Sequence, residues 1–225
     1  MGYTLVYTQV LEFFPYLIKG AFISLQIAIL AFFGGMFFGL IFATIRTFGN
    51  KLMNNVVICY VTFFTNTPQL VQIYFLFFAL PEFGILLSPF VAVLVGMTLN
   101  AAAYLCEIQR AGFLSIRQNE LDAAKTLNFT LTQQVKYVIL PHIMKVLFPP
   151  LSNHYIIMTL GTSMAAIFGV EELTGRAFNI NSETFRSVEI FSLTALVYIV
   201  ITFIATFLLA VIGRYFFKAK MRIIQ

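Results

Sequence analysis

The chain has 225 residues, of which 60% are hydrophobic and 10% are charged. Soluble globular domains carry about 25% charged residues, so this composition excludes that class. The net charge of +5 at pH 7 raises the question of nucleic-acid binding, but no basic cluster coincides with a nucleic-acid-binding motif. We therefore interpret the chain as an integral membrane protein.

Stretches with almost no charged side chains divide the sequence. They predict membrane-spanning helices at about residues 20–45, 54–80, 85–106, 138–168 and 190–213. Each provides the roughly 20 residues that cross a bilayer core, and backbone groups in lipid must form their hydrogen bonds within the helix. The sequence predicts an all-α integral membrane protein with five transmembrane helices in a single domain, residues 1–225.

The Lys and Arg residues predict the orientation of these spans, because cytoplasmic connections are enriched in them. The set assigned to the cytoplasm is Arg46, Lys51, Arg110, Arg117, Lys125, Lys136, Lys145, Arg214, Lys218, Lys220 and Arg222. Only Lys19, Arg176 and Arg186 fall on the other side. We expect the N-terminus outside and the C-terminus in the cytoplasm.

Residues 1–18 have little charge and include Phe13, Phe14, Tyr16 and Leu17. They suit a helix at the membrane interface or packed on the bundle, although a frayed lead into the first span fits equally well. The first span is too long for a signal-peptide core, so we expect it to be retained.

The cysteines and histidines give no sign of a reactive centre. Cys59 and Cys106 fall inside apolar spans, where we expect small core residues. His142 and His154 are isolated and match no metal-ligand spacing. We predict neither a metal site nor a catalytic site.

The connection after the third span predicts an amphipathic helix at about residues 117–129. Its apolar residues are Ile116, Leu121, Ala124, Leu127 and Leu131, and its charged residues are Arg117, Glu120, Asp122 and Lys125. We expect the apolar side to enter a cleft on a partner protein while the carboxylates form ion pairs. An amphipathic linker packed on its own bundle is the alternative.

The segment ELDAAKTLNFTLTQQVKYVILP (Glu120–Pro141) resembles the E-A-A, three residues, G, nine residues, I-x-L-P signature of bacterial ABC-transporter permeases. The matching positions are Asp122, Ala123, Ala124, Asn128, Val138, Leu140 and Pro141. Asp122 replaces the glutamate and keeps its charge. Asn128 replaces the glycine, and Asn is the next most tolerant residue of the left-handed conformation that ends a helix.

A longer region, residues 104–174, resembles the polar amino-acid permeases of the ABC importer family. The matching residues are Tyr104, Glu107, Arg110, Gly112, Ser115, Ile116, Pro141, Pro149, Pro150, Leu151, Asn153, Ser163, Gly169 and Glu172. Upstream, Asn66, Thr67, Pro68, Val71 and Gln72 match the family's F-R-N-T-P-L-L-V-Q segment. Asn119 and Thr65 depart from the family's usual glycine and arginine, and the resemblance covers nearly the whole chain.

This resemblance implies a type I ABC importer: two permeases, two cytoplasmic ATPases and an extracytoplasmic amino-acid-binding protein at a bacterial inner or plasma membrane. The chain has no G-x-x-x-x-G-K-[ST] phosphate loop, so ATP and magnesium are expected on the ATPase and no cofactor on this chain. The residues implied to contact the ATPase are Arg117, Glu120, Asp122, Ala123, Ala124, Leu127 and Asn128.

Polar residues inside apolar spans are the candidates for the translocation pathway, because they are costly against lipid. They are Asn66, Thr67, Pro68, Gln72, Asn100, Tyr104, Thr162 and Ser163. Each has an alternative structural role as a helix cap, an interhelical hydrogen bond or an interface anchor. Pro68 is expected to break the second span.

Glu107 and Arg110 are spaced for an ion pair along one helix. A structural pair is the favoured reading, and recognition of a substrate amino group is the alternative. The fourth span has only hydroxyls, such as Thr162, where the family often has a charged or amide residue. This favours a second, homologous permease that supplies more of the substrate site, and hence a heterodimer over a homodimer.

Other functions fit less well. A secondary transporter usually has about ten or more spans with internal repeats. A membrane anchor or assembly subunit without its own pathway matches five spans but does not explain the motif spacing. An ABC permease for another small polar solute is the remaining alternative.

Overall fold

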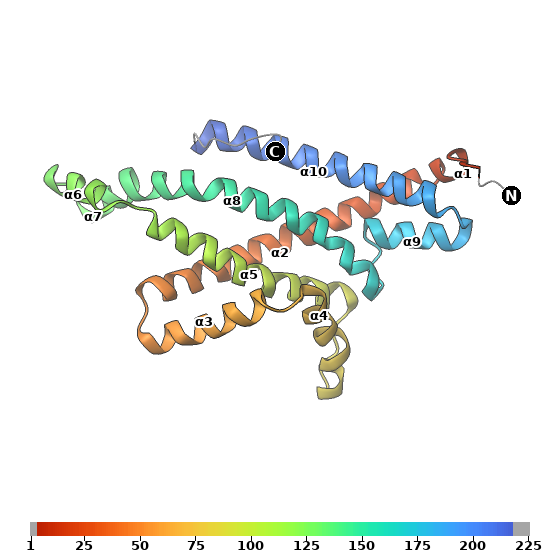
Figure 1. Cartoon of the computed structure of the whole chain (residues 1–225), viewed down its shortest axis with the longest axis horizontal. Coiled ribbons are helices and arrows are strands. Elements are labelled where there is room, and N and C mark those ends of the chain that lie inside the picture. The colour runs from red at the N-terminus through yellow and green to blue at the C-terminus, as the bar shows by residue number, and fades with distance from the viewer. Residues whose placement is uncertain (1–3, 218–225) are drawn as a thin grey trace. The chain divides into compact units, whose positions relative to one another are not determined.

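The computed structural model describes residues 4–217, and the secondary structure in that range consists of helices (Figure 1). This agrees with the predicted all-α class, whereas Lys218, Lys220 and Arg222 of the predicted cytoplasmic set lie outside the described residues. The elements are α1 (Thr8–Leu11), α2 (Phe14–Phe48), α3 (Lys51–Thr65), α4 (Gln69–Tyr74), the π-helix η1 (Phe75–Ala79), the 3-10 helix η2 (Leu80–Phe83), α5 (Pro89–Leu114), α6 (Gln118–Thr126), α7 (Leu131–Gln134), the π-helix η3 (Val135–Ile139), α8 (Leu140–Gly161), the 3-10 helix η4 (Thr162–Phe168), α9 (Leu173–Thr184) and α10 (Ser187–Phe217).

Helices α2, α5 and α10 are each long and apolar enough to cross a membrane. Two further candidates are bent pairs. Lys51–Thr65 and Gln69–Phe83 meet at 103°, and Leu131–Phe168 and Leu173–Thr184 meet at 46°. If each pair counts as one span, the described residues hold five.

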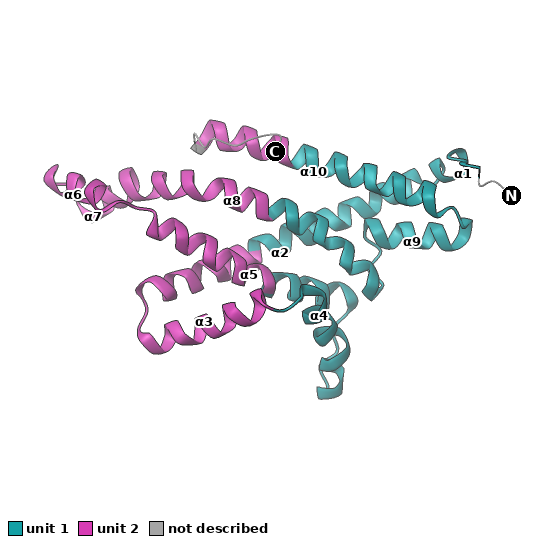
Figure 2. Cartoon of the chain, in the orientation of Figure 1, with its two compact units in different colours: residues 1–33, 67–99, 155–205 teal, residues 34–66, 100–154, 206–225 magenta. Residues whose placement is uncertain are grey.

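The chain divides into two compact units (Figure 2). The described part of unit 1 comprises residues 4–33, 67–99 and 155–205, and that of unit 2 comprises residues 34–66, 100–154 and 206–217. Four helices, α2, α5, α8 and α10, contribute residues to both. Each unit has a hydrophobic cluster of its own.

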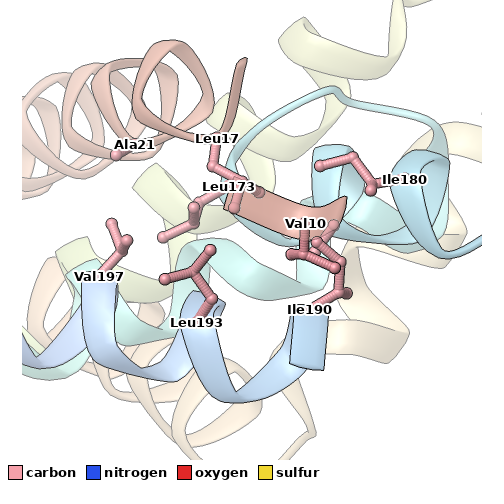
Figure 3. Packing of buried hydrophobic residues seen from close by; sticks show 9 residues of the cluster. Val10, Leu17, Ala21, Leu173, Ile180, Ile190, Leu193 and Val197 are labelled. Atoms are coloured by element: carbon pink, nitrogen blue, oxygen red, sulfur yellow. The ribbon is translucent and has the colours of Figure 1, made fainter. Parts of the chain in front are cut away.

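The core of unit 1 joins the N-terminal segment to the first, fourth and last candidate spans (Figure 3). Its buried members are Val10, Leu17, Ala21, Leu173, Ala177, Ile180, Ile190, Leu193 and Val197. Because Val10 of α1 is fully buried, this segment is packed on the protein and is not a frayed lead. Helix α2, which forms the first candidate span, begins at Phe14, earlier than the predicted start near residue 20.

Hydrogen bonds hold the same N-terminal segment against the start of α10. The guanidinium of Arg186 donates to the Thr4 carbonyl at 3.0 Å. The Val6 amide donates to Oε1 of Glu189 at 3.0 Å, and Glu189 is fully buried. The start of the described chain is therefore fixed by polar as well as apolar contacts.

The core of unit 2 contains Ala43, Val57, Val61, Ala103 and Cys106. Close approach of α2 and α5 requires glycine, since a Cβ at Gly35 would lie 2.6 Å from Cβ of Ala101.

Cys106 is a small core residue, as predicted, but the same prediction is wrong for Cys59, which is exposed. Successive helical residues point about 100° apart, so Cys59 lies on the side of α3 away from Val57 and Val61.

Candidate functional site: the coupling segment and the broken spans

Helix α6 lies within the predicted segment 117–129 and spans Gln118–Thr126, with Arg117 as its N-cap. It ends as the motif predicts. Asn128 has a φ of 54°, and its amide donates to the Lys125 carbonyl at 2.8 Å. Asparagine therefore adopts the left-handed conformation at the position where the motif has glycine, which confirms the prediction for this position.

The apolar side of α6 is used within the chain. Ala124 is only 3% exposed, Leu121 is half-buried, and α6 contacts α7 and η3. The expectation that this side enters a partner is wrong for Ala124, because its own chain covers that side chain. Leu127 and Leu131 remain exposed.

The two carboxylates of α6 differ in their surroundings. Asp122 is exposed and interacts within its own helix, accepting from Nε2 of Gln118 at 2.9 Å and lying 3.5 Å from Nζ of Lys125. Oε2 of Glu120 instead lies 3.5 Å from Nδ1 of His142 on α8. Among the residues predicted to contact the ATPase, the exposed ones are Arg117, Asp122, Ala123, Leu127 and Asn128.

Glu107 forms the predicted ion pair with Arg110, whose Nε lies 3.4 Å from Oε2. A second and closer partner, Arg46 of α2, binds the other carboxylate oxygen. Sequence reasoning missed Arg46 because it lies 61 residues away. The shared position of both residues near span ends that are predicted to be cytoplasmic was the available signal.

The second candidate span breaks where the sequence predicted. Helix α3 ends at Thr65, and α4 begins after Pro68, whose backbone is extended. Proline has no N–H and disfavours a helical conformation in the residue before it. The break leaves carbonyl groups at the end of α3 without helical partners.

Three of the eight predicted pathway residues donate hydrogen bonds to carbonyl groups at this break. In unit 2, Nδ2 of Asn100 donates to the Phe64 carbonyl at 3.1 Å, and the Tyr104 hydroxyl donates to the Thr65 carbonyl at 3.4 Å. In unit 1, Nε2 of Gln72 donates to Thr67, at 3.1 Å to its carbonyl and 2.8 Å to Oγ1. These residues therefore stabilise an irregular backbone that lipid would not tolerate.

The remaining polar candidates also bond locally. Nδ2 of Asn66 donates to the Thr62 carbonyl at 2.8 Å. The Thr162 and Ser163 hydroxyls donate to the carbonyls of Thr159 and Leu160 at 2.7 and 2.9 Å. The structure brings Asn100 and Tyr104 together at the end of α3, while Thr162 and Ser163 lie in η4 of unit 1.

One buried acidic residue matches the family pattern but is not among the predicted site residues. Glu172 is fully buried and caps α9, its side chain accepting from the Gly175 amide at 2.9 Å. An acidic residue just before a helix is an N-cap pattern, which was the signal available in the sequence. Its longer-range partners had no such signal.

A comparison with protein families identifies the class. Residues 35–218 match the family described as the binding-protein-dependent transport system inner membrane component. The chain belongs to this family. It is a multi-pass inner-membrane permease that works with an ATPase and a binding protein, and ATP is hydrolysed on the separate ATPase subunit.

Individual relatives match over most of their length. The glutamine transport system permease protein GlnP of Escherichia coli (strain K12) is 37% identical over 202 residues, covering 89% of this chain and 92% of that protein. The L-cystine transport system permease protein TcyB of Bacillus subtilis (strain 168) is 32% identical over 204 residues, covering 90% and 87%. A crystal structure of an amino acid ABC transporter with histidines matches with a TM-score of 0.87 and 29% identity, covering 94% of this chain and 99% of that chain.

Proposed function

We propose that this chain forms the translocation pathway of an ATP-driven importer for polar amino acids, together with a second permease. The proposal is carried by α6, which presents Asp122 and Ala123 at the motif spacing and is followed by Asn128 in the left-handed conformation. The substrate class is supported by relatives named for glutamine and cystine. An ABC permease for another small polar solute is the nearest alternative.

The exposed side of α6 is the proposed contact with the ATPase. Asp122 and Ala123 of α6 are exposed, and so is Leu127, which follows the helix. A small residue beside a carboxylate permits close approach with an ion pair at the edge. ATP can favour the outward-facing state only through contacts that differ between the two states, and we assign those contacts to this side of α6.

Charge reversal tests this contact. Asp122→Lys should abolish co-purification of the ATPase and ATP-dependent uptake, while the permease remains in the membrane. Glu183→Lys is the matched control, because Glu183 is an exposed carboxylate on α9, and it should leave co-purification intact. Equal ATPase recovery from both variants contradicts the proposed contact.

The translocation pathway is proposed to follow the broken second span, with Asn66 and Thr67 next to Pro68. In unit 2, Asn100 and Tyr104 hold the end of α3 in place. Tyr104→Phe removes one hydrogen bond without changing the ring, so it should lower uptake with the ATPase still bound. Unchanged uptake in Tyr104→Phe and in Asn66→Ala removes this break from the pathway.

A heterodimer is proposed in preference to a homodimer. The Thr162 and Ser163 hydroxyl protons are engaged with backbone carbonyls, so η4 offers little to the charged groups of an amino acid. A homologous partner permease would then supply more of the substrate site. Mass spectrometry of the gently purified complex tests this: a second permease supports the heterodimer, and an ATPase recovered with this chain alone contradicts it.

The proposed topology is one permease domain of five spans with the N-terminus outside and the C-terminus in the cytoplasm. The distribution of Lys and Arg, including Arg46, Arg110 and Arg214, supports it. A fluorescent protein fused after Gln225 should fold and fluoresce in bacteria, because that fusion would lie in the cytoplasm. A C-terminal fusion without fluorescence, together with a fluorescent N-terminal fusion, would indicate the opposite orientation.

An anchor or assembly subunit without its own pathway is the second candidate function. It predicts that substitutions around the break at Pro68 leave uptake unchanged while Asp122→Lys still disrupts the complex. The amino-acid importer predicts that both sets of substitutions lower uptake.

A further inference from the structure

The fourth candidate span is interrupted between η4 and α9. Gly169 follows η4 with a φ of 81°, a left-handed conformation that favours glycine. Helix α9 begins at Leu173, and the two parts meet at 46°. An interruption of this kind is a natural hinge, because few backbone hydrogen bonds cross it.

The side chain of Glu172, which lies in this interruption, bonds to the helices around it. Its Oε1 accepts from the Gly175 amide at 2.9 Å. Its Oε2 accepts from Oγ of Ser24 on α2 at 2.8 Å and from the Tyr198 hydroxyl on α10 at 2.9 Å. One carboxylate therefore joins three helices, and we refer to Ser24, Glu172, Gly175 and Tyr198 as the Glu172 cluster.

The partners of Glu172 are also bound to α9. Oγ of Ser24 accepts from the Leu173 amide at 3.2 Å, and the Tyr198 hydroxyl lies 3.0 Å from Oγ1 of Thr174. The first amides of a helix have no partner within that helix. In α9, the amides of Leu173 and Gly175 depend on side chains of the Glu172 cluster.

Helix α2 packs closely against the start of α9. A Cβ at Gly20 of α2 would lie 2.9 Å from the Glu172 carbonyl oxygen and 2.9 Å from Cα of Leu173. Leu17, Ala21, Leu173 and Val197 belong to the core of unit 1 (Figure 3). Since Glu172 and Ser24 are fully buried, water has no access to replace their hydrogen bonds.

The neighbouring Glu171 provides a contrast within the same turn. Its side chain is 55% exposed and lies 3.8 Å from the guanidinium of Arg176. It accepts from the Tyr16 hydroxyl at 3.2 Å. Exposed contacts of this kind contribute little to stability, so Glu171 is a matched control for the buried carboxylate.

We propose that Glu172 is a positioning residue for transport, which fixes α9 to α2 and α10 so that the interruption after Gly169 does not act as an independent hinge. This inference rests on the proposed function. In an importer whose spans must reorient, the outer part of the fourth span then moves with α2 and α10. Release of α9 uncouples that movement from ATP hydrolysis.

Hydrogen exchange of residues 170–180, measured by mass spectrometry on the complex as purified, tests the positioning role directly. Glu172→Ala should raise exchange at the Leu173 and Gly175 amides about tenfold, as expected for loss of a buried hydrogen bond. Glu172→Gln should stay within about threefold, because an amide oxygen still accepts from Gly175 and both hydroxyls can reorient. Glu171→Ala should leave exchange unchanged.

Transport measurements on the same variants test whether the positioning of α9 affects the coupling of uptake to ATP hydrolysis. Glu172→Ala should lower substrate taken up per ATP hydrolysed, while Glu172→Gln and Glu171→Ala keep the wild-type ratio. The proposal is overturned if Glu172→Ala matches Glu171→Ala in exchange, or if exchange rises with the ratio unchanged. Should Glu172→Ala fail to fold, Tyr198→Phe removes one donor only, and unchanged exchange in that variant overturns the proposal.

Failure of the proposed function has a separate signature. If the wild-type complex shows no ATP-dependent uptake, the importer assignment falls. The exchange contrast between Glu172→Ala and Glu171→Ala still decides whether Glu172 positions α9.

Discussion

Glu107 is predicted to stabilise unit 2 mainly through Arg46 and only slightly through Arg110. The Arg46 side chain is 15% exposed, against 32% for Arg110 and 40% for Glu107. Nε of Arg46 is also buried without a hydrogen-bond partner. Substituting Glu107 by Gln would leave this half-buried cation without its counter-ion.

The expected losses follow from this difference in burial. Breaking a buried ion pair costs about 3–5 kcal/mol, whereas an exposed pair contributes about 0–1 kcal/mol. Between these limits we expect about 2 kcal/mol for Glu107→Gln, about 1–2 kcal/mol for Arg46→Gln and less than about 1 kcal/mol for Arg110→Gln. For a chain of this size 1 kcal/mol corresponds to about 2–4 °C in the unfolding midpoint.

Thermal unfolding of the three variants in one detergent checks the order. Glu107→Gln should lower the midpoint by about 4–8 °C, and Arg110→Gln by less than about 4 °C. A double variant of Glu107 and Arg46 should lose less than the sum of the single losses, because both remove the same pair. Equal losses of stability in Arg110→Gln and Arg46→Gln would refute the larger contribution of Arg46.

Three further substitutions concern backbone conformation and close packing. Asn128→Val should lower stability by about 1–2 kcal/mol, because a β-branched residue is strained at positive φ. Asn128→Gly should keep the turn. Co-purification of the ATPase distinguishes the two variants, and equal recovery contradicts the strain. Phe185 has a φ of 55° and is 82% exposed, so Phe185→Asn should raise the unfolding midpoint by about 2–4 °C; a lower midpoint would show that the exposed ring makes contacts. Gly20→Ala should cost about 1–3 kcal/mol in denaturant unfolding, because the new methyl meets backbone atoms, and an unchanged midpoint contradicts this packing.

Local patterns in the sequence predicted the features that depend on local chemistry. Pro68 ends α3 and breaks the second span because the ring removes a donor and blocks the helical conformation before it. Asn128 follows α6 in the left-handed conformation because asparagine tolerates positive φ. The spacing of Glu107 and Arg110 on one helix predicted their ion pair.

Contacts between distant segments were not predictable in the same way. Arg46 and Glu107 are 61 residues apart, and Ser24 and Glu172 are 148 residues apart, so no local spacing relates them. The buried side of α6 was misjudged for a related reason. Amphipathicity shows that a helix has an apolar side, but whether its own chain or a partner covers that side depends on tertiary packing.

We propose that this chain carries amino acids through the membrane at the expense of ATP hydrolysed on another subunit. The most direct measurement is uptake of radiolabelled glutamine into proteoliposomes that hold the purified complex, with ATP supplied on the side of the ATPase and the binding protein on the other. We expect uptake that requires ATP and the binding protein and that is lost in Asp122→Lys but kept in Glu183→Lys. Uptake by the permease alone, without ATPase and ATP, would contradict ATP-driven import.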